Sequence, residues 1–297
     1  ESGQKKSEGT TKNDKRNGKY TLWDENGQIA VETNYKDGKL IWHKEVGYAD
    51  LENKIPVTEK TKFRFASASK FVTSAMLAKM VEEDKIDLQK EIHYYLPNYP
   101  EKKSSINSIQ LASHTSGMAN YEEGLDENKD VRPEVYESAV DATEVFKDRP
   151  LKSISGTEYN YSSYGTNLLS AVMEKALNKK YPVMLKELAR QTNALSLEAE
   201  SLNVNQENWS KLYNTQGNEY PRNNLTYKWA SGALLGTAID LAKVGATLLD
   251  PEFISEETLT LFTTPVKLND GEIAEGKRYA MGLGFRMSED NKGRGYF

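Results

Sequence analysis

The sequence predicts an α+β fold, in which an antiparallel β-sheet is flanked by helices and joined to a mainly helical subdomain. Two observations predict it. Strand-like runs with turn signals fill much of the first fifty residues, and a strand-like run returns at residues 279–287. Between them apolar residues recur at helical spacing, as in Val72, Ala75 and Met76. We therefore expect one antiparallel sheet assembled from both chain ends.

The N-terminal part divides at residues 17 and 46. Residues 1–17 are rich in Lys, Ser, Gly and Thr with almost no apolar residue, which predicts a flexible tail. The pairs Asn17-Gly18, Asn26-Gly27 and Asp37-Gly38 are hairpin turn signals around strand-like runs at 20–23, 29–35 and 40–46. Residues 18–46 therefore predict a β-meander. Their turn spacing resembles MORN-type β-hairpin arrays, and an ordinary sheet edge of two or three strands is the alternative.

Helical periodicity dominates the middle of the chain. Residues 164–177 predict a second amphipathic helix. Thr237 and Asp240 have the spacing of a capping box, and the helical period continues after them. A chain of 297 residues is long enough for one large domain or two smaller ones.

Composition restricts the classes of partner. The chain is 37% hydrophobic and 28% charged with a net charge of −5, which fits a globular protein and gives no electrostatic reason to expect a nucleic-acid partner. It has no cysteine, so disulfides and thiolate zinc sites are excluded. No apolar run has the length of a transmembrane segment. Because the first residue is Glu1, a signal segment can be missing, and we expect an exported protein, periplasmic or tethered to the envelope.

One nucleophile motif remains after the others are excluded. No G-x-S-x-G elbow and no H-E-x-x-H motif occurs. Ser67 and Lys70 form an S-x-x-K directly before the predicted helix of Val72. If Ser67 opens that helix, residue i+3 lies on the same face, and a partly desolvated lysine can take the serine proton. The alternative is a helix cap beside a solvated charge.

Several phrases resemble the serine β-lactamase-like family, which includes class C β-lactamases, penicillin-binding-protein-like peptidases and related esterases. They are FRFASASKFVTSAMLAKMVEEDKIDL, LASHTSGM, SGTEYNYSSYGTNLLSAVME and KWASGALLGTAIDLAKVG, in the family's order. The phrases YSSYG and YKWASG are most similar to the mitochondrial β-lactamase-like branch and its bacterial relatives. The resemblance covers residues 47–297 and implies the β-lactamase/transpeptidase-like fold there.

The resemblance also implies roles for four residues. Ser67 matches the family's nucleophile, Lys70 its lysine and Tyr161 the tyrosine of the Y-x-N motif, which passes protons to and from the nucleophile and leaving group. Ser163 stands at the third position of that motif, where many members have Asn, and is expected to bind substrate. A hydroxyl can donate and accept hydrogen bonds but is shorter than an amide. No metal or organic cofactor is implied.

Other aromatic and imidazole side chains stay open as alternatives. His114 is a candidate general base because of its imidazole, but the resemblance places it in a structural turn. Tyr95, Tyr159 and Trp229 could line the cleft or belong to the core.

The resemblance also marks a departure. The family has a third motif, K-T-G or H-x-G, soon after the phrase matched by residues 279–287, and no such motif follows in this sequence. We therefore expect the last sheet strands and the C-terminal helix to be missing, and the loss of one oxyanion donor would cost about 10²–10³ in rate. The leading hypothesis is a serine hydrolase acting through a Ser67 acyl-enzyme on a β-lactam, peptide or small ester. The alternatives are a catalytically impaired binding or scaffold protein and a truncated fragment. The oligomeric state stays open.

Overall fold

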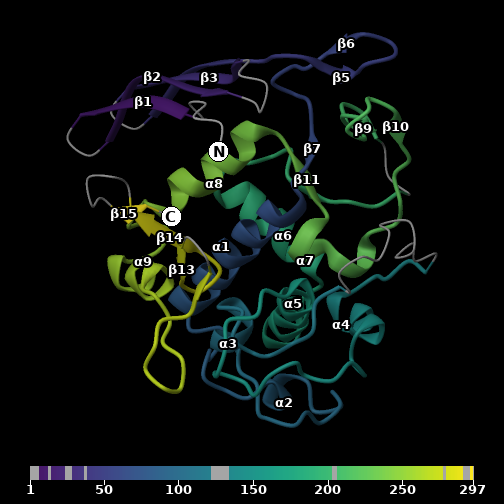
Figure 1. Ribbon diagram of the computed structural model, residues 1–297, viewed down its shortest axis with the longest axis vertical. Coiled ribbons are helices and arrows are strands. Elements are labelled where there is room, and N and C mark those ends of the chain that lie inside the picture. The colour runs from purple at the N-terminus through teal and green to yellow at the C-terminus, as the bar shows by residue number, and fades with distance from the viewer. Residues whose placement is uncertain are drawn as a thin grey trace. The chain divides into compact units, whose positions relative to one another are not determined.

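The computed structural model describes residues 7–12, 15–23, 29–36, 39–121, 134–202, 206–276, 279–289 and 295–296. The chain forms two compact units (Figure 1). One combines Glu1–Thr61 with Asn208–Tyr220, and the other combines Lys62–Glu207 with Pro221–Phe297. The boundary expected at residue 47 lies inside the first unit.

The first unit contains a four-stranded antiparallel sheet in the order β1-β2-β3-β4. Its strands are β1 (Ser7–Lys12), β2 (Lys15–Trp23), β3 (Ile29–Lys36) and β4 (Lys39–Lys44). Two short hairpins complete the unit: β5 (Tyr48–Asp50) with β6 (Ile55–Pro56), and β9 (Leu212–Tyr213) with β10 (Glu219–Tyr220). The strand order is that of a meander, and the similarity to MORN-type arrays stays a prediction.

Two features of this sheet differ from the sequence expectation. Strand β1 lies in the segment for which composition predicts a flexible tail, and it pairs with β2 over Ser7–Lys12. Asn17-Gly18 is not a turn but lies within β2, where Gly18 pairs with Tyr35. Gly18 has φ +91, so it supplies a local irregularity inside a strand. The pairs Asn26-Gly27 and Asp37-Gly38 lie outside the described residues.

The second unit is mainly helical. Its described helices are α1 (Ser69–Glu82), α2 (Ile92–Tyr95), α3 (Ser108–Ala112), α4 (Ala139–Ala142), α5 (Ser163–Leu177), α6 (Tyr181–Gln191), α7 (Trp229–Gly232), α8 (Ala238–Leu248) and α9 (Glu256–Thr263). One sheet has the order β7-β11-β8, from Phe63–Arg64, Leu234–Gly236 and Glu198–Ala199. The other has the order β12-β13-β14-β15, from Glu275–Gly276, Tyr279–Met281, Arg286–Glu289 and Gly295–Tyr296. The predicted α+β class is confirmed.

The expectation of one sheet built from both chain ends is wrong for the described residues. The N-terminal strands and strands β12–β15 form separate sheets, because each set pairs with its own sequence neighbours. The strand expected at residues 279–287 is two strands, β13 and β14. They are joined by a tight turn in which the Gly282 N–H donates to the Phe285 carbonyl at 2.9 Å and Gly284 has φ +87.

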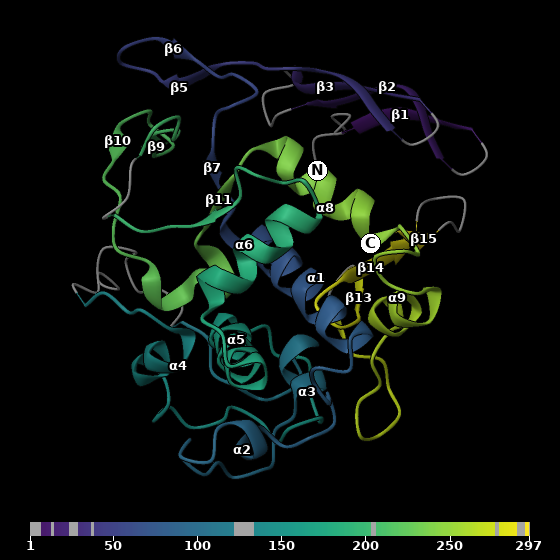
Figure 2. The ribbon, with the colours of Figure 1, turned by 180° about the vertical axis from the view of Figure 1, so that it is seen from behind.

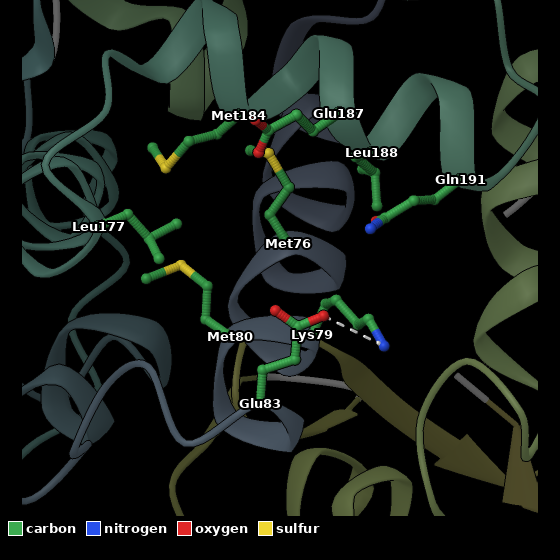
Figure 3. A pocket seen from close by; sticks show the side chains of 9 residues that line it. All are labelled: Met76, Lys79, Met80, Glu83, Leu177, Met184, Glu187, Leu188 and Gln191. Carbon is green, nitrogen blue, oxygen red and sulfur yellow. Dashed lines mark ion pairs between the residues drawn. The ribbon is translucent and has the colours of Figure 1, made fainter.

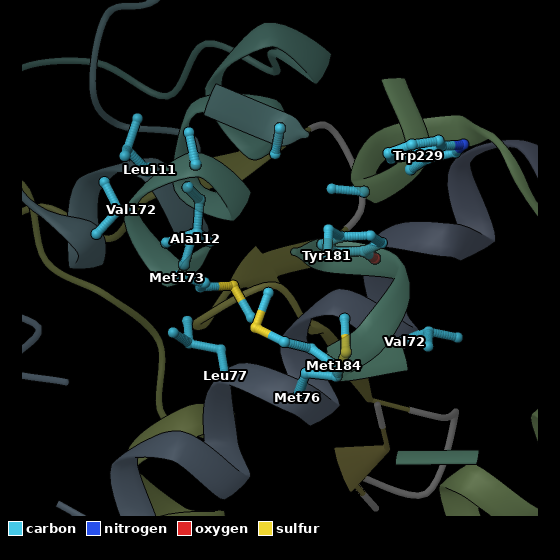
Figure 4. Packing of buried hydrophobic residues seen from close by; sticks show 14 of the residues in the cluster. Val72, Met76, Leu77, Leu111, Ala112, Val172, Met173, Tyr181, Met184 and Trp229 are labelled. Carbon is cyan, nitrogen blue, oxygen red and sulfur yellow. The ribbon is translucent and has the colours of Figure 1, made fainter. Parts of the chain in front are cut away.

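Helix α1 is the centre of the second unit. The sequence predicts an amphipathic helix, but Val72, Ala75, Leu77 and Ala78 are all fully buried, on different sides of it. Helices α5, α6, α7, α8 and α9 all contact α1, so both of its faces are covered (Figures 2 and 4). Full burial of one such aliphatic side chain contributes about 1.5–3 kcal/mol, so this packing holds the helix in place.

The other two helix predictions are confirmed. Helix α5 begins at Ser163 after the N-cap Ser162, whose hydroxyl accepts from the Gly165 N–H. Helix α8 begins after a complete Thr237/Asp240 capping box. In each case a side-chain oxygen satisfies an N–H that has no partner within the helix, which fixes where the helix starts.

A buried carboxylate joins three helices. Glu174 of α5 is 5% exposed, and its oxygens accept from the N–H groups of Ala139 (2.9 Å), Val140 (3.0 Å) and Tyr181 (2.6 Å). Those donors lie at the starts of α4 and α6, where helix N–H groups lack partners within the helix. Burial raises the pKa of Glu174. The carboxylate therefore fixes two helix starts against α5.

We predict that Gly284→Ala destabilises the protein more than Gly271→Ala does. Both glycines have positive φ, so alanine at either position costs about 1–2 kcal/mol. A Cβ on Gly271 would meet nothing within 4 Å, whereas one on Gly284 would clash with the Ser74 hydroxyl and lie 2.7 Å from Ser74 Cβ. We expect this overpacking to add about 1–3 kcal/mol, measured by urea unfolding. Equal losses in the two variants would contradict the close contact between the β13–β14 turn and α1.

Candidate active site

Ser67 lies at the start of the central helix. Strand β7 leads into a 3₁₀ turn, Ala66–Ala68, and α1 begins at the next residue. Ser67 therefore lies in the turn before the α-helix, one turn from Lys70, and it is exposed. Ala66 has φ +46, a conformation that costs a residue with a Cβ about 1–2 kcal/mol. Such strain persists only where the surrounding structure enforces it.

Lys70 is buried beneath this turn, with 6% of its surface exposed. Its Nζ donates to the Ser231 carbonyl at 2.7 Å and to Ser163 Oγ at 3.1 Å, and it lies 3.5 Å from Ser67 Oγ. Lys70 lies on α1, Ser163 on α5 and Ser231 on α7, so three helices meet at this amine. No described carboxylate forms an ion pair with Lys70.

Burial without a counter-ion changes the charge state of Lys70. Desolvation, with a smaller contribution from the positive charge of Arg286, lowers the pKa of Lys70 to about 7. A lysine with that pKa is substantially neutral at physiological pH and can accept a proton.

Tyr161 completes a hydrogen-bonded group around Ser67. Its hydroxyl donates to Ser67 Oγ at 2.9 Å, and Lys70 Nζ lies 4.8 Å from the centroid of its ring. Tyr161 is half-buried and directly precedes the N-cap of α5, so the start of that helix sets its position. Ser67, Lys70 and Tyr161, predicted from the sequence, therefore meet at one place.

Ser163 is buried at the first turn of α5. Its hydroxyl accepts the hydrogen bond from Lys70, and its N–H donates to Asn120 Oδ1 at 2.9 Å. The side chain is therefore engaged with Lys70, and its contact with a substrate stays a prediction. Sequence reasoning missed Asn120, which follows the His114 segment with no motif of its own.

A second cation lies beside Tyr161. The Arg286 guanidinium carbon is 5.7 Å from the centroid of the Tyr161 ring and 4.5 Å from that of Tyr279. The Tyr279 hydroxyl is 3.2 Å from the hydroxyl of Tyr159. Tyr159 thus lies beside the site, as one of the sequence alternatives has it. Arg286 and Tyr279 were missed, because the sequence gives no sign of which side chains of β13 and β14 lie beside Tyr161.

His114 lies under Tyr161 as a neutral support. It is 3% exposed, its ring centroid is 4.6 Å from that of Tyr161, and its Nδ1 accepts from the Ser162 N–H at 3.3 Å. Burial, followed by the charges of Lys70 and Arg286, lowers the pKa of His114 to about 3.

Two other aromatic candidates lie away from this group. Trp229 is 7% exposed and donates through Nε1 to the Glu200 carbonyl at 2.7 Å. The Tyr95 hydroxyl accepts from the Asp87 N–H at 2.9 Å. Neither contact involves Ser67, Lys70 or Tyr161.

A buried ion cluster holds the strand that leads to Ser67. Arg64 of β7 donates to Glu200 through Nε at 2.6 Å and Nη2 at 2.5 Å, and Arg222 donates to the same carboxylate at 2.7 Å. Glu200 is 1% exposed, so removing either arginine would weaken the pairing of a buried charge. The cluster therefore fixes the approach to the nucleophile.

The second unit also has a hollow that lies apart from Ser67, Lys70 and Tyr161 (Figure 3). Its sides come from the C-terminal half of α1, the end of α5 and helix α6, with Met76, Met80 and Met184 among its lining residues. The pair Lys79–Glu83 lies at its edge, 3.4 Å apart. It contains none of the predicted site residues. Within the described residues, no group of three or more His, Asp or Glu side chains is arranged to hold a metal ion.

Comparison with known proteins agrees with this geometry. The model of the family described as Beta-lactamase matches residues 28–297. The chain belongs to the β-lactamase family. The serine β-lactamase-like protein LACTB, mitochondrial, of Homo sapiens is 26% identical, over 84% of this chain and 61% of its own length. A teichoic acid D-alanine hydrolase of Staphylococcus aureus is 30% identical, over 52% of this chain and 36% of its own length. The chain thus spans about three fifths of its mitochondrial relative.

Solved structures of other proteins share the fold of this chain. EstCE1, a hydrolase with promiscuous acyltransferase activity, superposes with a TM-score of 0.72 at 20% identity, over 89% of this chain and 78% of its own. A penicillin-binding protein from Bacillus halodurans gives 0.71 at 21% identity, over 89% and 79%. None of the described helices is long and apolar enough to cross a bilayer.

We predict that Lys70 makes stability pH-dependent. Its pKa is about 7 in the folded protein and ordinarily 10.5, so between these values the unfolded chain binds more protons and stability rises with pH. The slope from this one group approaches about 1.4 kcal/mol per pH unit. Chemical unfolding between pH 7 and 10 should show it, and Lys70→Met should remove it. The exposed Lys186, replaced by Met, is the matched control. An unchanged slope in Lys70→Met would contradict the charge state inferred for Lys70.

Proposed function

We propose that the protein is a serine hydrolase that cleaves an amide or ester through an acyl-enzyme on Ser67. The observation that carries this proposal is the position of Ser67 Oγ, 2.9 Å from the Tyr161 hydroxyl and 3.5 Å from the Lys70 amine. Membership of the β-lactamase family and the lowered pKa of Lys70, about 7, support it. A serine hydroxyl needs such a base before it can attack a carbonyl.

The proposed reaction has two steps. Neutral Lys70 takes the Ser67 proton, directly or through Tyr161, as Oγ bonds to the carbonyl carbon of the substrate. The tetrahedral intermediate then collapses, the bond to the leaving group breaks, and Tyr161 returns a proton to that group. In the second step Tyr161 and Lys70 take a proton from water as its oxygen bonds to the acyl carbon. The bond between that carbon and Ser67 Oγ then breaks, Oγ regains a proton, and the acid is released. In this scheme Ser163 positions Lys70, and we propose that the Ser163 hydroxyl also contacts the substrate.

The substrate class is proposed from the chemistry and from relatives. A nucleophilic serine suits β-lactams, peptides with D-amino acids and small esters alike, because the pocket and not the fold selects among them. The staphylococcal relative named for teichoic acid D-alanine hydrolysis supports D-amino-acyl esters as one class to test. It also supports export to the cell envelope as the proposed location.

The first test is covalent labelling. We expect one fluorophosphonate adduct per chain by intact-protein mass spectrometry, located at Ser67, and none in Ser67→Ala. A separate incubation with a penicillin tests β-lactam recognition. Ser69→Ala is an unsuitable control because Ser69 Oγ accepts the Leu234 N–H, so the exposed Ser105, replaced by Ala, serves instead. A folded protein without any adduct would favour the alternative of a binding or scaffold protein.

The second test is the pH dependence of labelling. Because the base must be neutral, the rate should rise with pH and level off above about 7, the pKa of Lys70. Tyr161→Phe should lower the plateau by about 10²-fold or more, since it removes a proton-transfer group. A rate that stays constant from pH 5.5 to 9 would rule out Lys70 as the base.

A further inference from the structure

Helix α7 ends after one turn, and two side chains of α1 take the place of the hydrogen bond that would continue it. In a longer helix the Leu234 N–H would donate to the Ala230 carbonyl. Instead, the Leu234 N–H donates to Ser69 Oγ of α1 at 3.2 Å. The Ala230 carbonyl accepts from Thr73 Oγ1 of the same helix at 2.8 Å. Ser69 and Thr73 are four residues apart on α1, so both can face the end of α7.

The end of α7 leaves the Ser231 carbonyl for Lys70. A carbonyl inside an α-helix accepts from the N–H four residues later, which for Ser231 would be that of Leu235. Leu235 lies in strand β11, and the Ser231 carbonyl accepts from Lys70 Nζ at 2.7 Å. The contacts of this amine with Ser163 Oγ and Ser67 Oγ are longer, at 3.1 Å and 3.5 Å. The end of α7 therefore supplies the shortest of the described hydrogen bonds of Lys70.

Tyr181 of α6 fixes the direction of the Thr73 hydroxyl. The Tyr181 hydroxyl lies 2.7 Å from Thr73 Oγ1, and both side chains are fully buried. Thr73 has a single hydroxyl hydrogen, and the Ser69 carbonyl, at 3.2 Å, is a more distant acceptor for it than the Ala230 carbonyl. When Tyr181 donates to Thr73, that hydrogen stays with the Ala230 carbonyl, and each of these buried groups has a partner. One chain of hydrogen bonds thus joins α6, α1 and α7.

We infer that the hydroxyls of Thr73 and Ser69 position Lys70 by ending α7 after one turn. The Ser231 carbonyl is thereby presented to the Lys70 amine. Thr73 and Ser69 are positioning residues, because they act on the amine through α7 and not on a substrate. The geometry of the amine is independent of any reaction, whereas its consequence for catalysis rests on the proposed function, in which Lys70 is the base.

The position of this carbonyl affects the charge state of Lys70. A carbonyl oxygen only accepts hydrogen bonds, and a hydrogen bond from an ammonium group favours the charged form. The titratable and charged groups that face Lys70 from other elements are Tyr161, His114 and Arg286, and none of them is a carboxylate. A weaker bond to the Ser231 carbonyl should therefore lower the pKa of Lys70 below its value of about 7.

Substitution of Thr73 tests this inference. Thr73→Val removes the hydroxyl at nearly the same shape, and Thr73→Ser keeps it. The measured quantity is the pH midpoint of Lys70, followed by carbon-13 NMR of protein labelled at lysine Cε, with Lys70→Met identifying the signal. A hydrogen bond to a charged group is worth about one to two pH units, so we expect Thr73→Val to lower the midpoint by about half a unit or more. Thr73→Ser should restore it.

Three further variants sharpen the result. Ser69→Ala should shift the midpoint in the same direction, and it decides the question if Thr73→Val does not fold. Tyr181→Phe should shift the midpoint less, because Thr73 keeps its own hydrogen for the Ala230 carbonyl. Thr192→Val is the matched control, since the buried Thr192 hydroxyl donates to the Leu188 carbonyl within α6, and it should leave the midpoint unchanged. A midpoint that stays constant or rises in the folded variants of Thr73 and Ser69 overturns the inference.

The NMR titration needs no substrate, so it separates this inference from the proposed function. If fluorophosphonate labels Ser67, the pH at which labelling levels off should move with the NMR midpoint in Thr73→Val. A lowered midpoint in a protein that is never labelled supports the positioning role although the acyl transfer has failed. Labelling of Ser67 with an unchanged midpoint in Thr73→Val and Ser69→Ala overturns the positioning role and leaves the proposed function in place.

Discussion

The burial of Lys70 is the constraint on which the rest of the site depends. An ammonium group with 6% exposure and no described carboxylate partner is costly, and this cost falls on a helix whose apolar side chains are largely buried. The burial of apolar side chains along α1 offsets it. Because α5 and α7 supply Ser163 Oγ and the Ser231 carbonyl, the amine keeps hydrogen-bond partners in either protonation state. The packing of α1, α5 and α7 therefore sets both the position of Lys70 and its lowered pKa.

The groups around Lys70 extend the same logic. Each neighbour is either neutral or positive: Tyr161, the buried imidazole of His114, and Arg286. A carboxylate at any of these positions would raise the pKa of Lys70 and keep it charged. The buried carboxylate of Glu200 is paired with Arg64 and Arg222, and it holds strand β7, which precedes Ser67. The lack of a described carboxylate next to Lys70 therefore keeps the pKa of this lysine low.

Local patterns predicted much of this arrangement, and long-range pairing explains what they missed. The S-x-x-K spacing and the capping signals of α5 and α8 depend on neighbours within one helical turn, so they were readable from the sequence. Sheet partners and side-chain facing depend on residues far apart along the chain. The sequence therefore misassigned Asn17-Gly18 to a turn, merged β13 with β14, and gave no reason to single out Arg286. The amphipathic pattern expected for α1 does not describe it, because residues on different sides of the helix are buried and five helices contact it.

The turn at Gly284 has a consequence for how the two cations are spaced. Gly284 lies two residues before Arg286, and Ser74, which it touches, lies one helical turn after Lys70. This contact between the Gly284 backbone and the Ser74 side chain therefore helps to set the position of Arg286 on the hairpin relative to Lys70 on α1. A displacement of α1 along its axis would press Ser74 against the β13–β14 turn, so the separation of the two cations depends on this contact.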